Sequence, residues 1–568
     1  GKMWIGVNGT WNGSGNPSTG ANPDWTDLPK TGLSPFAGCY GSGNTITLNA
    51  GQKAFKYTNH SGFSPIATSF LPEPTIKRGD EAVAVALYTG NGASQTINNL
   101  RLSPDLVWIK RRNSSGDHQL YDTVRGPLKG LSSDQSIAEW EYAAGLSSFN
   151  SDGFTIGSLG GANAANDLHV GWMWDAGEST TTIAAGSLNS SVYNQSHAIT
   201  SNITDNLPAS GNPLANWFNG QRANKLEPSG SGSLDFSSVS ALQNFSGTLQ
   251  FAVSAYSGST SMKFVINAST DNLTFTTEAL PSSSGGFPSQ LLTIPVTSLS
   301  TLDFTSISGQ STQFWGMYLD GKLLVDSTAT PDTLPSIAST VRARPETGFS
   351  ICSYTGTEGG TWAHSLQKAP EFVIVKRRNA NAQWCIWHKA ILNTEYLMFD
   401  NPAAQTFNVW GDTSPDNNVV TVSGDSYTGN LNDTYVAYSW TSIEGYSSIG
   451  SFQNPSSTDG AFVFCGFKPA LIIAKCVKNI SSSAGHGDWI LKDTTRSPFN
   501  NPSDGNTLVA NVNNSEDGYY NASQAAVDIL SNGFKIRHPN SSPLGDPGRL
   551  YIYAAWSEHS FASNNRAV

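Results

Sequence analysis

The chain has 568 residues, a formal net charge of −11 and only 13% charged residues, about half the share of an ordinary soluble domain. This acidic balance argues against binding of a nucleic-acid backbone, and no apolar run approaches the ~20 residues of a membrane-spanning helix. The 16 Trp and 26 Phe residues exclude a disordered chain. The five cysteines are scattered and odd in number, so we expect buried thiols in a reducing compartment rather than a disulfide framework: Cys39, Cys352, Cys385, Cys465 and Cys476.

Residues 1–80 begin with GKMWIGVNGTWNGSGNP. The chain shows no signal peptide and starts at Gly1 rather than Met, so we expect preceding sequence to be missing. The opening phrase resembles the C-terminal half of a SPRY domain, with the shared residues Gly1, Lys2, Trp4, Gly6, Asn8, Gly9 and Trp11. The resemblance implies a partial sandwich with an open sheet edge that other residues or a neighbouring chain must cover.

An eleven-residue phrase occurs twice, as SPDLVWIKRRN at Ser103–Asn113 and APEFVIVKRRN at Ala369–Asn379, with a weaker copy at Lys468–Asn479. Each copy is followed downstream by an apolar run that ends in Trp. This spacing is far longer than the roughly 20–50 residues of a solenoid repeat. We therefore predict three homologous domains, near 81–187, 336–450 and 451–568, with repeated structural residues at Pro104, Lys110, Pro370, Lys376, Pro469 and Lys475.

The repeated phrases are β-branched and aromatic, which is typical of strands covered on both faces. Alternation in Leu550–Trp556 places Leu, Ile, Ala and Trp on one face. The best helix candidate is Ser132–Ala144, which would form two or three turns. Between the first two repeats, 188–335 contains Ser/Thr-rich strands and ends in a strand, an Asp-Gly turn and a strand at Phe314–Asp326. This hairpin resembles the closing hairpin of concanavalin-like sandwiches.

The predicted fold class is all-β, with serial β-sandwich domains of the jelly-roll or concanavalin-like kind, three of them homologous. The order of a SPRY-like piece, a first repeat, a sandwich insertion and two further repeats resembles structural proteins of tailed phages, especially marine ones. The resemblance covers nearly the whole chain and implies a virion component of the tail-fibre or host-recognition kind, with no catalytic residue. The matching segments are Pro104–Lys110, Arg125-Gly126, Ser148–Phe154, Pro370–Lys376 and Phe467–Lys475.

Catalytic and metal-binding motifs are absent from the sequence: there is no GxSxG, HExxH, CxxC or phosphate-binding glycine loop. His118, His364 and His388 lie near repeat motifs, and we expect them to be ordinary surface or hydrogen-bonded histidines. Glu139 and Glu141 would lie ~7 Å apart on a strand, as glycosidase carboxylates can, but two solvated acids flanking a buried Trp are favoured. Asp412–Asn418 could offer oxygens to calcium, although a plain turn is the favoured interpretation. We expect no cofactor.

The basic clusters have two interpretations. Arg111, Arg112, Arg377 and Arg378 could pair with anionic sugars or with the carboxylates of a partner, whereas the preceding lysines, retained in all three repeats, suggest strand ends with the Lys stem packed on aromatic rings. The structural interpretation is favoured. For a glycan contact, the best exposed aromatic candidate is Trp217, beside Asn216 and Asn219 in a turn-like sequence.

We therefore predict a non-enzymatic virion protein, assembled in the host cytoplasm, that forms a tail fibre or receptor-binding adhesin. The alternatives are a head fibre, decoration or filament subunit, and less favoured a capsule depolymerase. Expected partners are other phage structural proteins, a host surface glycan or protein receptor, and further copies of the chain in a homotrimer. No nucleic acid and no membrane insertion are expected.

Overall fold

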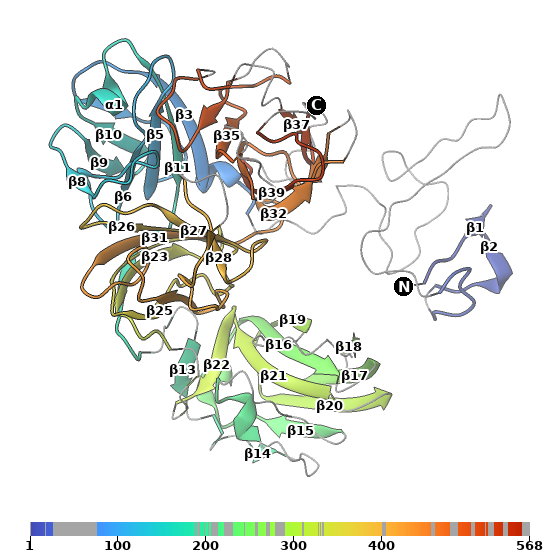
Figure 1. The fold of residues 1–568 in the computed structure, drawn as a ribbon. Coiled ribbons are helices and arrows are strands. Elements are labelled where there is room, and N and C mark those ends of the chain that lie inside the picture. The colour runs from blue at the N-terminus through green and yellow to red at the C-terminus, as the bar shows by residue number, and fades with distance from the viewer. Residues whose placement is uncertain are drawn as a thin grey trace, which may run out of the picture.

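The computed structural model is built almost entirely from strands (Figure 1). Its described helices are single turns: η1 (Asn12–Ser14), η3 (Gly79–Glu81), α1 (Gly160–Asn163), η4 (Leu214–Trp217) and α2 (Ser240–Gln243). None of the described helices has the length and apolarity needed to span a membrane. The structure describes residues 2–8, 10–17, 19–26, 76–187, 190, 193–197, 199–200, 202, 204–205, 214–220, 226, 231–243, 245–255, 259–267, 273–278, 290–308, 312–327, 329, 331, 334–399, 405–455, 460–477, 487–500, 506–516, 518–520, 527–537 and 543–558.

The main sheet has one strand order in all three repeats. In repeat 1 it runs β3 (Val83–Thr89), β11 (Leu168–Trp174), β5 (Leu106–Arg111), β6 (Gln119–Asp122). In repeat 2 the same order is β24 (Phe349–Thr355), β31 (Thr434–Trp440), β26 (Phe372–Arg377), β27 (Cys385–His388). In repeat 3 it is β32 (Ser447–Gln453), β39 (Leu550–Trp556), β34 (Leu471–Cys476), β35 (Ile490–Asp493), followed by β36 (Leu508–Val509).

A smaller sheet completes each repeat. Repeat 1 has the order β4 (Gln95–Ile97), β10 (Gly153–Ile156), β9 (Leu146–Asn150), and repeat 3 has β33 (Phe462–Phe464), β38 (Gly533–Ile536), β37 (Val527–Leu530). Repeat 2 has β25 (Gly359–Ala363) with β30 (Val419–Ser423). Two short pairs lie beside the main sheets: β7 (Lys129–Gly130) with β8 (Trp140–Glu141), and β28 (Glu395–Tyr396) with β29 (Gln405–Thr406). The shared strand order of the main sheets is the one expected if the same domain occurs three times in the chain.

Each central strand separates two apolar layers. In β39, Ile552, Ala554 and Trp556 belong to a large cluster that residues of all three repeats share, whereas Tyr551 and Tyr553 belong to the core of repeat 3 alone. The repeated phrase of repeat 1 forms β5, which is buried in the same way. Its alternate residues point into the shared cluster and into the core of repeat 1. This double burial explains why these strands are apolar at nearly every position.

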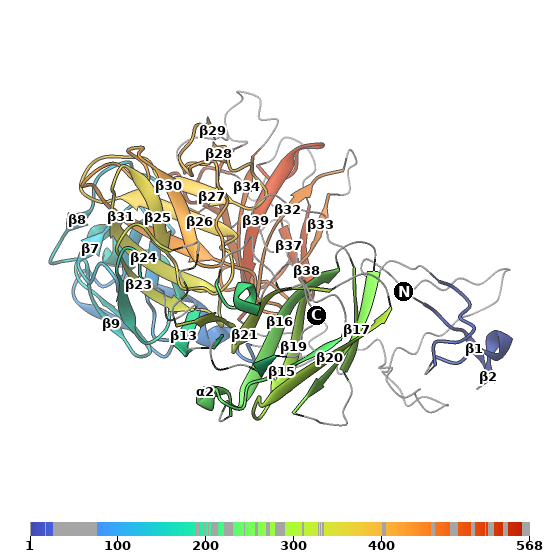
Figure 2. The same cartoon turned by 90° about the horizontal axis from the view of Figure 1, so that it is seen from below.

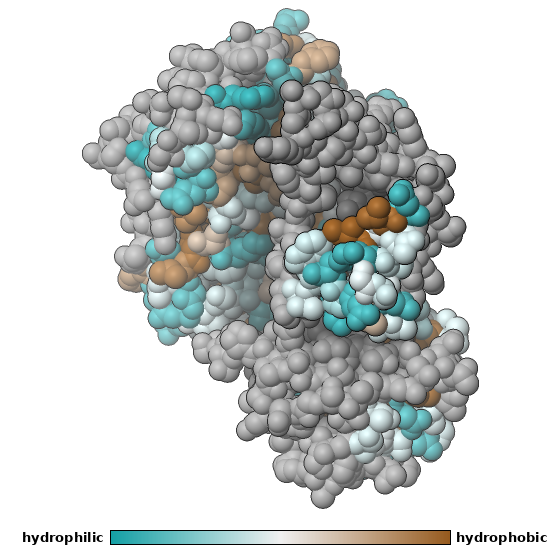
Figure 3. Space-filling model, turned by 90° about the vertical axis from the view of Figure 1, so that its right-hand side faces the viewer, coloured by the Kyte–Doolittle hydropathy of each residue, from teal (hydrophilic) through white to brown (hydrophobic). Residues whose placement is uncertain are grey.

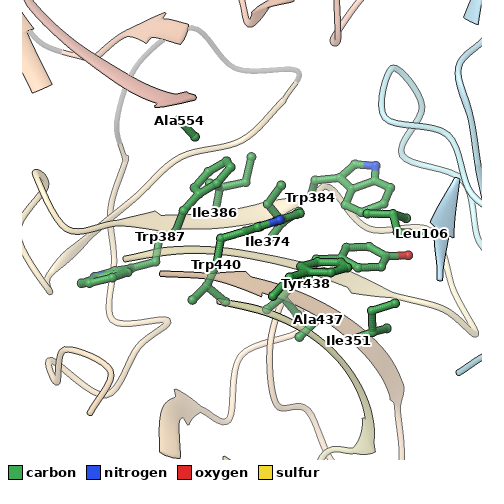
Figure 4. Packing of buried hydrophobic residues seen from close by; sticks show 14 of the residues in the cluster. Leu106, Ile351, Ile374, Trp384, Ile386, Trp387, Ala437, Tyr438, Trp440 and Ala554 are labelled. Atoms are coloured by element: carbon green, nitrogen blue, oxygen red, sulfur yellow. The ribbon is translucent and has the colours of Figure 1, made fainter. Parts of the chain in front are cut away.

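Three tryptophans mark the axis around which the repeats pack. The rings of Trp174, Trp440 and Trp556, one from each repeat, lie edge to face with centroid separations of 5.9, 5.4 and 6.0 Å. In Figure 4, Trp440 and Tyr438 of repeat 2 face the same cluster as Leu106 of repeat 1 and Ala554 of repeat 3. The three main sheets therefore surround one common core with approximate threefold symmetry.

The sandwich domains expected in series also pack against one another where one repeat leads to the next. Asp175, just after the first repeat's terminal Trp174, is buried and its carboxylate pairs with Arg344 of repeat 2 at 2.6 Å. Asp105 of repeat 1 likewise pairs with Arg342 at 2.7 Å. The repeat boundaries also differ slightly: β12 (Thr180–Ile183) joins the main sheet of repeat 2. The junction is a packed interface, because burial of the apolar sheet faces outweighs the freedom of the linker.

The insertion is a separate sandwich, which lies below the repeats in Figure 1 and in front of them in Figure 2. One sheet contains β13 (Tyr193–His197), β22 (Lys322–Asp326), β21 (Thr312–Leu319), β16 (Gly247–Ala255) and β19 (Gln290–Val296). The other contains β14 (Thr204–Asp205), β15 (Gly232–Asp235), β20 (Thr301–Ser308), β17 (Ser259–Ile266) and β18 (Leu273–Glu278). The predicted hairpin is β21–β22, and its Asp320 and Gly321 have φ values of 47° and 78°, as a tight hairpin turn requires.

The insertion leaves and re-enters its host through one pair of strands. β12 pairs with β23 (Ser339–Arg344) in antiparallel fashion, and beyond them Gly186 N–H donates to Pro335 O at 2.7 Å. Its hydrophobic core is also separate from the cluster that the repeats share. The sandwich therefore occupies the position of a hairpin loop.

Excision of the insertion tests this arrangement. Joining Gly186 to Pro335 through an Asn-Gly turn should leave the three repeats folded, because the strand pair already brings both ends together. We expect the melting temperature of the repeats to fall by no more than about 4 °C, which corresponds to about 1 kcal/mol for a domain of 150–250 residues. Calorimetry would measure it, and an unfolded product would contradict the assignment.

Two other expectations concern a helix in the first repeat and the SPRY-like N-terminal region. Ser132–Ala144 is not a helix: most of it has no regular secondary structure, and it contains β8. Hydrogen bonds to the other repeats hold this segment in place. Ser132 O accepts from Trp384, and Ser133 Oγ donates to Ala510 O. In the SPRY-like start, β1 (Gly6–Val7) pairs with β2 (Thr10–Trp11) and isolated bridges join Met3 to Trp25 and Asn16 to Ala21. Residues 27–75 of that predicted sandwich, with Cys39, lie outside the described residues. On the side of the molecule shown in Figure 3, the coloured residues are largely polar, with apolar ones in small groups.

Candidate functional site: the seams between the three repeats

Each pair of repeats meets along a seam, and one hydrogen bond recurs at the same place in all three seams. His118 Nε2–H of repeat 1 donates to Val509 O of repeat 3 at 3.0 Å. The residue at the equivalent position of the other repeats is Trp, and Trp384 Nε1–H donates to Ser132 O at 2.7 Å while Trp489 Nε1–H donates to Met398 O at 2.9 Å. The seams therefore follow one another in a closed ring.

The repeated lysines are fully buried, and two of them donate hydrogen bonds across a seam. Lys110 Nζ donates to Asn514 O of repeat 3 at 2.7 Å, and Lys376 Nζ donates to Ser136 O of repeat 1 at 3.0 Å. Lys475 Nζ donates to Gly487 O and lies 5.4 Å from the centroid of the Trp489 ring. Burial lowers the pKa of Lys110 to about 8 and that of Lys475 to about 7. Pro104, Pro370 and Pro469 are also buried, and they precede the same strands, whereas the lysines lie near the strand ends.

Two seams are closed by ion pairs. Arg378 of repeat 2 makes a two-pronged pair with Glu139 of repeat 1 at 2.9 and 3.0 Å, and Glu139 also pairs with the buried Arg125 at 3.1 Å. In the next seam, Arg112 of repeat 1 pairs with Glu516 of repeat 3 at 2.7 Å. Glu516 in turn pairs with the buried Arg496 at 2.8 Å, in the same pattern.

The third seam has a different composition. Counting along the repeats places Val477 where the others have Arg112 and Arg378, and Gln405 where they have Glu139 and Glu516. In the same seam His388 replaces Asp122 and Asp493, and its ring contacts Tyr553 O at 3.4 Å. Arginine and glutamate are therefore present or absent together, which is what a pairing across each seam requires.

The four arginines named as candidates for an anionic sugar or a partner's carboxylates pair with carboxylates of this chain, in line with the favoured structural interpretation. Arg112 and Arg378 lie in the seams, and Arg111 and Arg377 pair with Asp167 and Asp433 of their own repeats at 2.9 and 2.8 Å. The second expectation, an exposed Trp217, is wrong: its side chain is 1% exposed and packs against Phe218, Phe251 and Phe314 in the core of the insertion. Asn216 and Asn219 are only partly buried, beside this core residue.

The structure also places the acidic candidates and the cysteines. Glu139 is not a solvated acid, because it is held in the ion pairs of a seam, whereas Glu141 is exposed. Asp416 Oδ1 accepts from the backbone N–H groups of Asn418 and Val419, which is a turn geometry. No three His, Cys, Asp or Glu side chains gather as metal ligands would within the described part of the chain. Cys352, Cys385, Cys465 and Cys476 are buried free thiols.

Comparison with known proteins places the chain in a family. The model of DUF7483, a domain of unknown function, matches residues 80–204 and 308–560. The chain belongs to the DUF7483 family. No curated protein matches the chain.

The gap in the DUF7483 match falls inside the insertion. Residues 205–307 are unmatched, and they contain most strands of the sandwich that sits on the β12–β23 hairpin. The matched residues include all three repeats and therefore all three seams. The family match thus spans the closed ring of repeats together with the first and last strands of the sandwich, and it omits the middle of the sandwich.

The buried histidines of this DUF7483 member predict acid sensitivity. Burial lowers the pKa of His364 to about 4 and that of His388 to about 3, against about 6.5 in an unfolded chain. Between these values only the unfolded state takes up the proton, so stability is complete above pH 6.5 and falls as the pH drops toward 4. We expect a loss of up to about 2 kcal/mol per histidine by pH 5. Denaturant titrations at pH 7.5 and pH 5 would measure it, and His364→Gln should reduce the difference.

Proposed function

We propose that this chain is a structural protein of a tailed-phage virion, most specifically a tail fibre or receptor-binding adhesin without enzymatic activity. The observation that carries the proposal is a rigid ring of three repeats that holds an independent sandwich on a hairpin. Such a rigid scaffold with a separately folded module at its surface suits recognition of another surface. The phage-like order of domains in the sequence supports the same proposal.

The insertion is the part that we propose to contact a host glycan or protein receptor. Its two ends lie together, so it can vary without disturbing the seams. The repeats, in contrast, direct two of their lysines and two of the arginine pairs toward one another. Partners in the particle would be other phage structural proteins, and the site of assembly would be the host cytoplasm.

A second candidate is a head fibre, decoration or filament subunit, since a closed, charge-poor all-β body would also serve there. A capsule depolymerase is less favoured, because the carboxylate candidate Glu139 is engaged by two arginines. The decisive experiment is imaging of virions with a labelled antibody fragment raised against the insertion. Label at the distal tail is the expected result, and label on the head or along a filament would reject the adhesin in favour of the second candidate.

The threefold packing gives no support to the predicted homotrimer, because that packing occurs within one chain. The remaining reason to expect a homotrimer is the N-terminal segment, where Val7, Trp11 and Trp25 are exposed. We expect light scattering at micromolar concentration to give about three times the chain mass of 60.4 kDa. A mass near that of one chain would contradict the prediction.

A further inference from the structure

Repeat 3 carries an unusual edge strand, β33, in its smaller sheet. Phe462 and Phe464 are 47% and 65% exposed, whereas Val463 between them is 5% exposed and packs into the repeat. β33 pairs with β38 and has no partner strand on its other side among the described strands. The strand contains no charged residue and no proline, which are the usual protections of an edge.

The hydrogen-bonding phase of β33 shows which backbone groups face outward. Cys465 N–H donates to Asn532 O and Ala461 O accepts from Ile536 N–H, so the residues at odd positions pair with β38. In an antiparallel ladder, the alternate residues direct their N–H and C=O groups to the opposite side. The outward groups are therefore those of Phe462 and Phe464, the same residues whose rings are exposed.

The equivalent edges of the other repeats are treated differently. In repeat 2, Thr361 takes the position of Phe462, and its backbone N–H donates to Ser336 Oγ while its C=O accepts from Ile337 N–H at 2.8 Å. This edge is thus already covered by another segment of the chain. In repeat 1 the two outward positions are the polar Thr96 and Asn98. Only repeat 3 combines a strand edge without a described partner and two exposed aromatic rings.

We propose that β33 pairs with β33 of a second copy of this chain, in antiparallel register about a twofold axis through Val463. Phe462 of one copy then forms both backbone hydrogen bonds with Phe464 of its partner, and the reverse. An isologous contact places residue i against residue j and residue j against residue i, so the Phe-Val-Phe sequence sets a phenylalanine opposite a phenylalanine at both hydrogen-bonded pairs. The two smaller sheets become one continuous sheet, and the four phenylalanine rings form cross-strand aromatic pairs on its outer face.

The contact is expected to be weak between isolated molecules. A three-residue strand buries far less than the ~1,200 Å² of the smallest stable interfaces. In a particle that holds neighbouring copies close together, the same contact gains from a high effective concentration. A second copy fits this edge better than an unrelated strand, because both the backbone phase and the aromatic positions are self-complementary.

Register-specific cross-linking tests the proposal on the purified full-length chain. Paired residues of this kind have Cα atoms about 5.5 Å apart, within the range of a disulfide. Phe462→Cys and Phe464→Cys, mixed as two single variants and oxidised, should give a covalent dimer of twice 60.4 kDa. Each variant alone and the wild type should give less than a tenth of that yield, because position 462 does not face its own copy.

A second measurement avoids cysteine. Phe464→Glu should lower self-association, measured by sedimentation at rising concentration, at least tenfold, whereas Thr96→Glu on the edge of repeat 1 should leave it unchanged. Equal cross-linking in the mixture and in the single variants, or a monomer at all concentrations, would overturn the proposal. Neither assay depends on where the protein lies in a particle, so the proposal can fail while the proposed function stands.

Discussion

Glu139→Gln is expected to destabilise the repeats strongly, by about 3 kcal/mol. The carboxylate neutralises Arg125, whose side chain is fully buried, and Arg378 from the neighbouring repeat. The guanidinium groups beside Glu139 hold the pKa of its carboxyl below its usual range, although burial opposes this shift. Arg125 keeps its pair with the buried Asp122, so the charge left uncompensated is that of Arg378 in the seam. Removing one partner of a buried pair costs about 3–5 kcal/mol, and the low end applies because Arg378 is partly exposed. Denaturant unfolding would measure the loss.

Two companion variants make the test specific to the seam. Glu141→Gln changes an exposed carboxylate two residues away and should alter stability by no more than about 0.5 kcal/mol. Combining Glu139→Gln with Arg378→Val reproduces the residue pair of the third seam, so the double variant should be less destabilised than the sum of its single variants. Strict additivity would show that the pair does not couple the repeats.

Trp440→Ala is expected to have the largest effect, because it opens the centre of the shared core. Trp440 contacts Trp174 and Trp556 of the other two repeats and stacks on Phe349 and Phe372 of its own. Truncation of a buried aromatic residue to Ala typically costs about 3–5 kcal/mol. Since three repeats share this cluster, we expect all of them to unfold together in one transition at a lower temperature.

Calorimetry of this variant contains its own control. The insertion has a separate core, so its unfolding transition should keep its temperature while that of the repeats falls. Trp25→Ala, at a tryptophan that is 46% exposed, should change neither. A shift confined to repeat 2, with repeats 1 and 3 unaffected, would mean that the repeats are energetically independent.

Much of the fold could be predicted from the sequence because strand signals are local. The phrases at Ser103 and Ala369, the Asp320-Gly321 turn and the alternation in Leu550–Trp556 each depend on neighbouring residues only. The ring of repeats could not be predicted in this way, because it depends on which apolar face meets which. The alternating faces of β11, β31 and β39 show that both sides are buried, but not that one side belongs to a neighbouring repeat.

The candidate site shows the same limit. Trp217 lies between two asparagines in a turn-like sequence, yet it ends a single helical turn that packs inward on three phenylalanines. The partners of the arginines were within reach of the sequence, since Glu139 and Glu516 each lie eight residues after an equivalent leucine, Leu131 and Leu508. Gln405 takes that position after Leu397, where the matching arginine is replaced by Val477. Comparing the three repeats residue by residue would have linked them.

The approximate symmetry of the tryptophan triangle also affects how the protein can evolve. In a trimer of identical chains, every substitution appears three times around the axis, so a change that suits one surface is imposed on the other two. Here the three positions Trp174, Trp440 and Trp556 are encoded separately, and each repeat can change alone. One repeat carries an entire sandwich at a hairpin, another has a polar edge, and a third displays two phenylalanines. A single gene thus obtains the stability of a threefold body together with three surfaces that selection can alter one at a time.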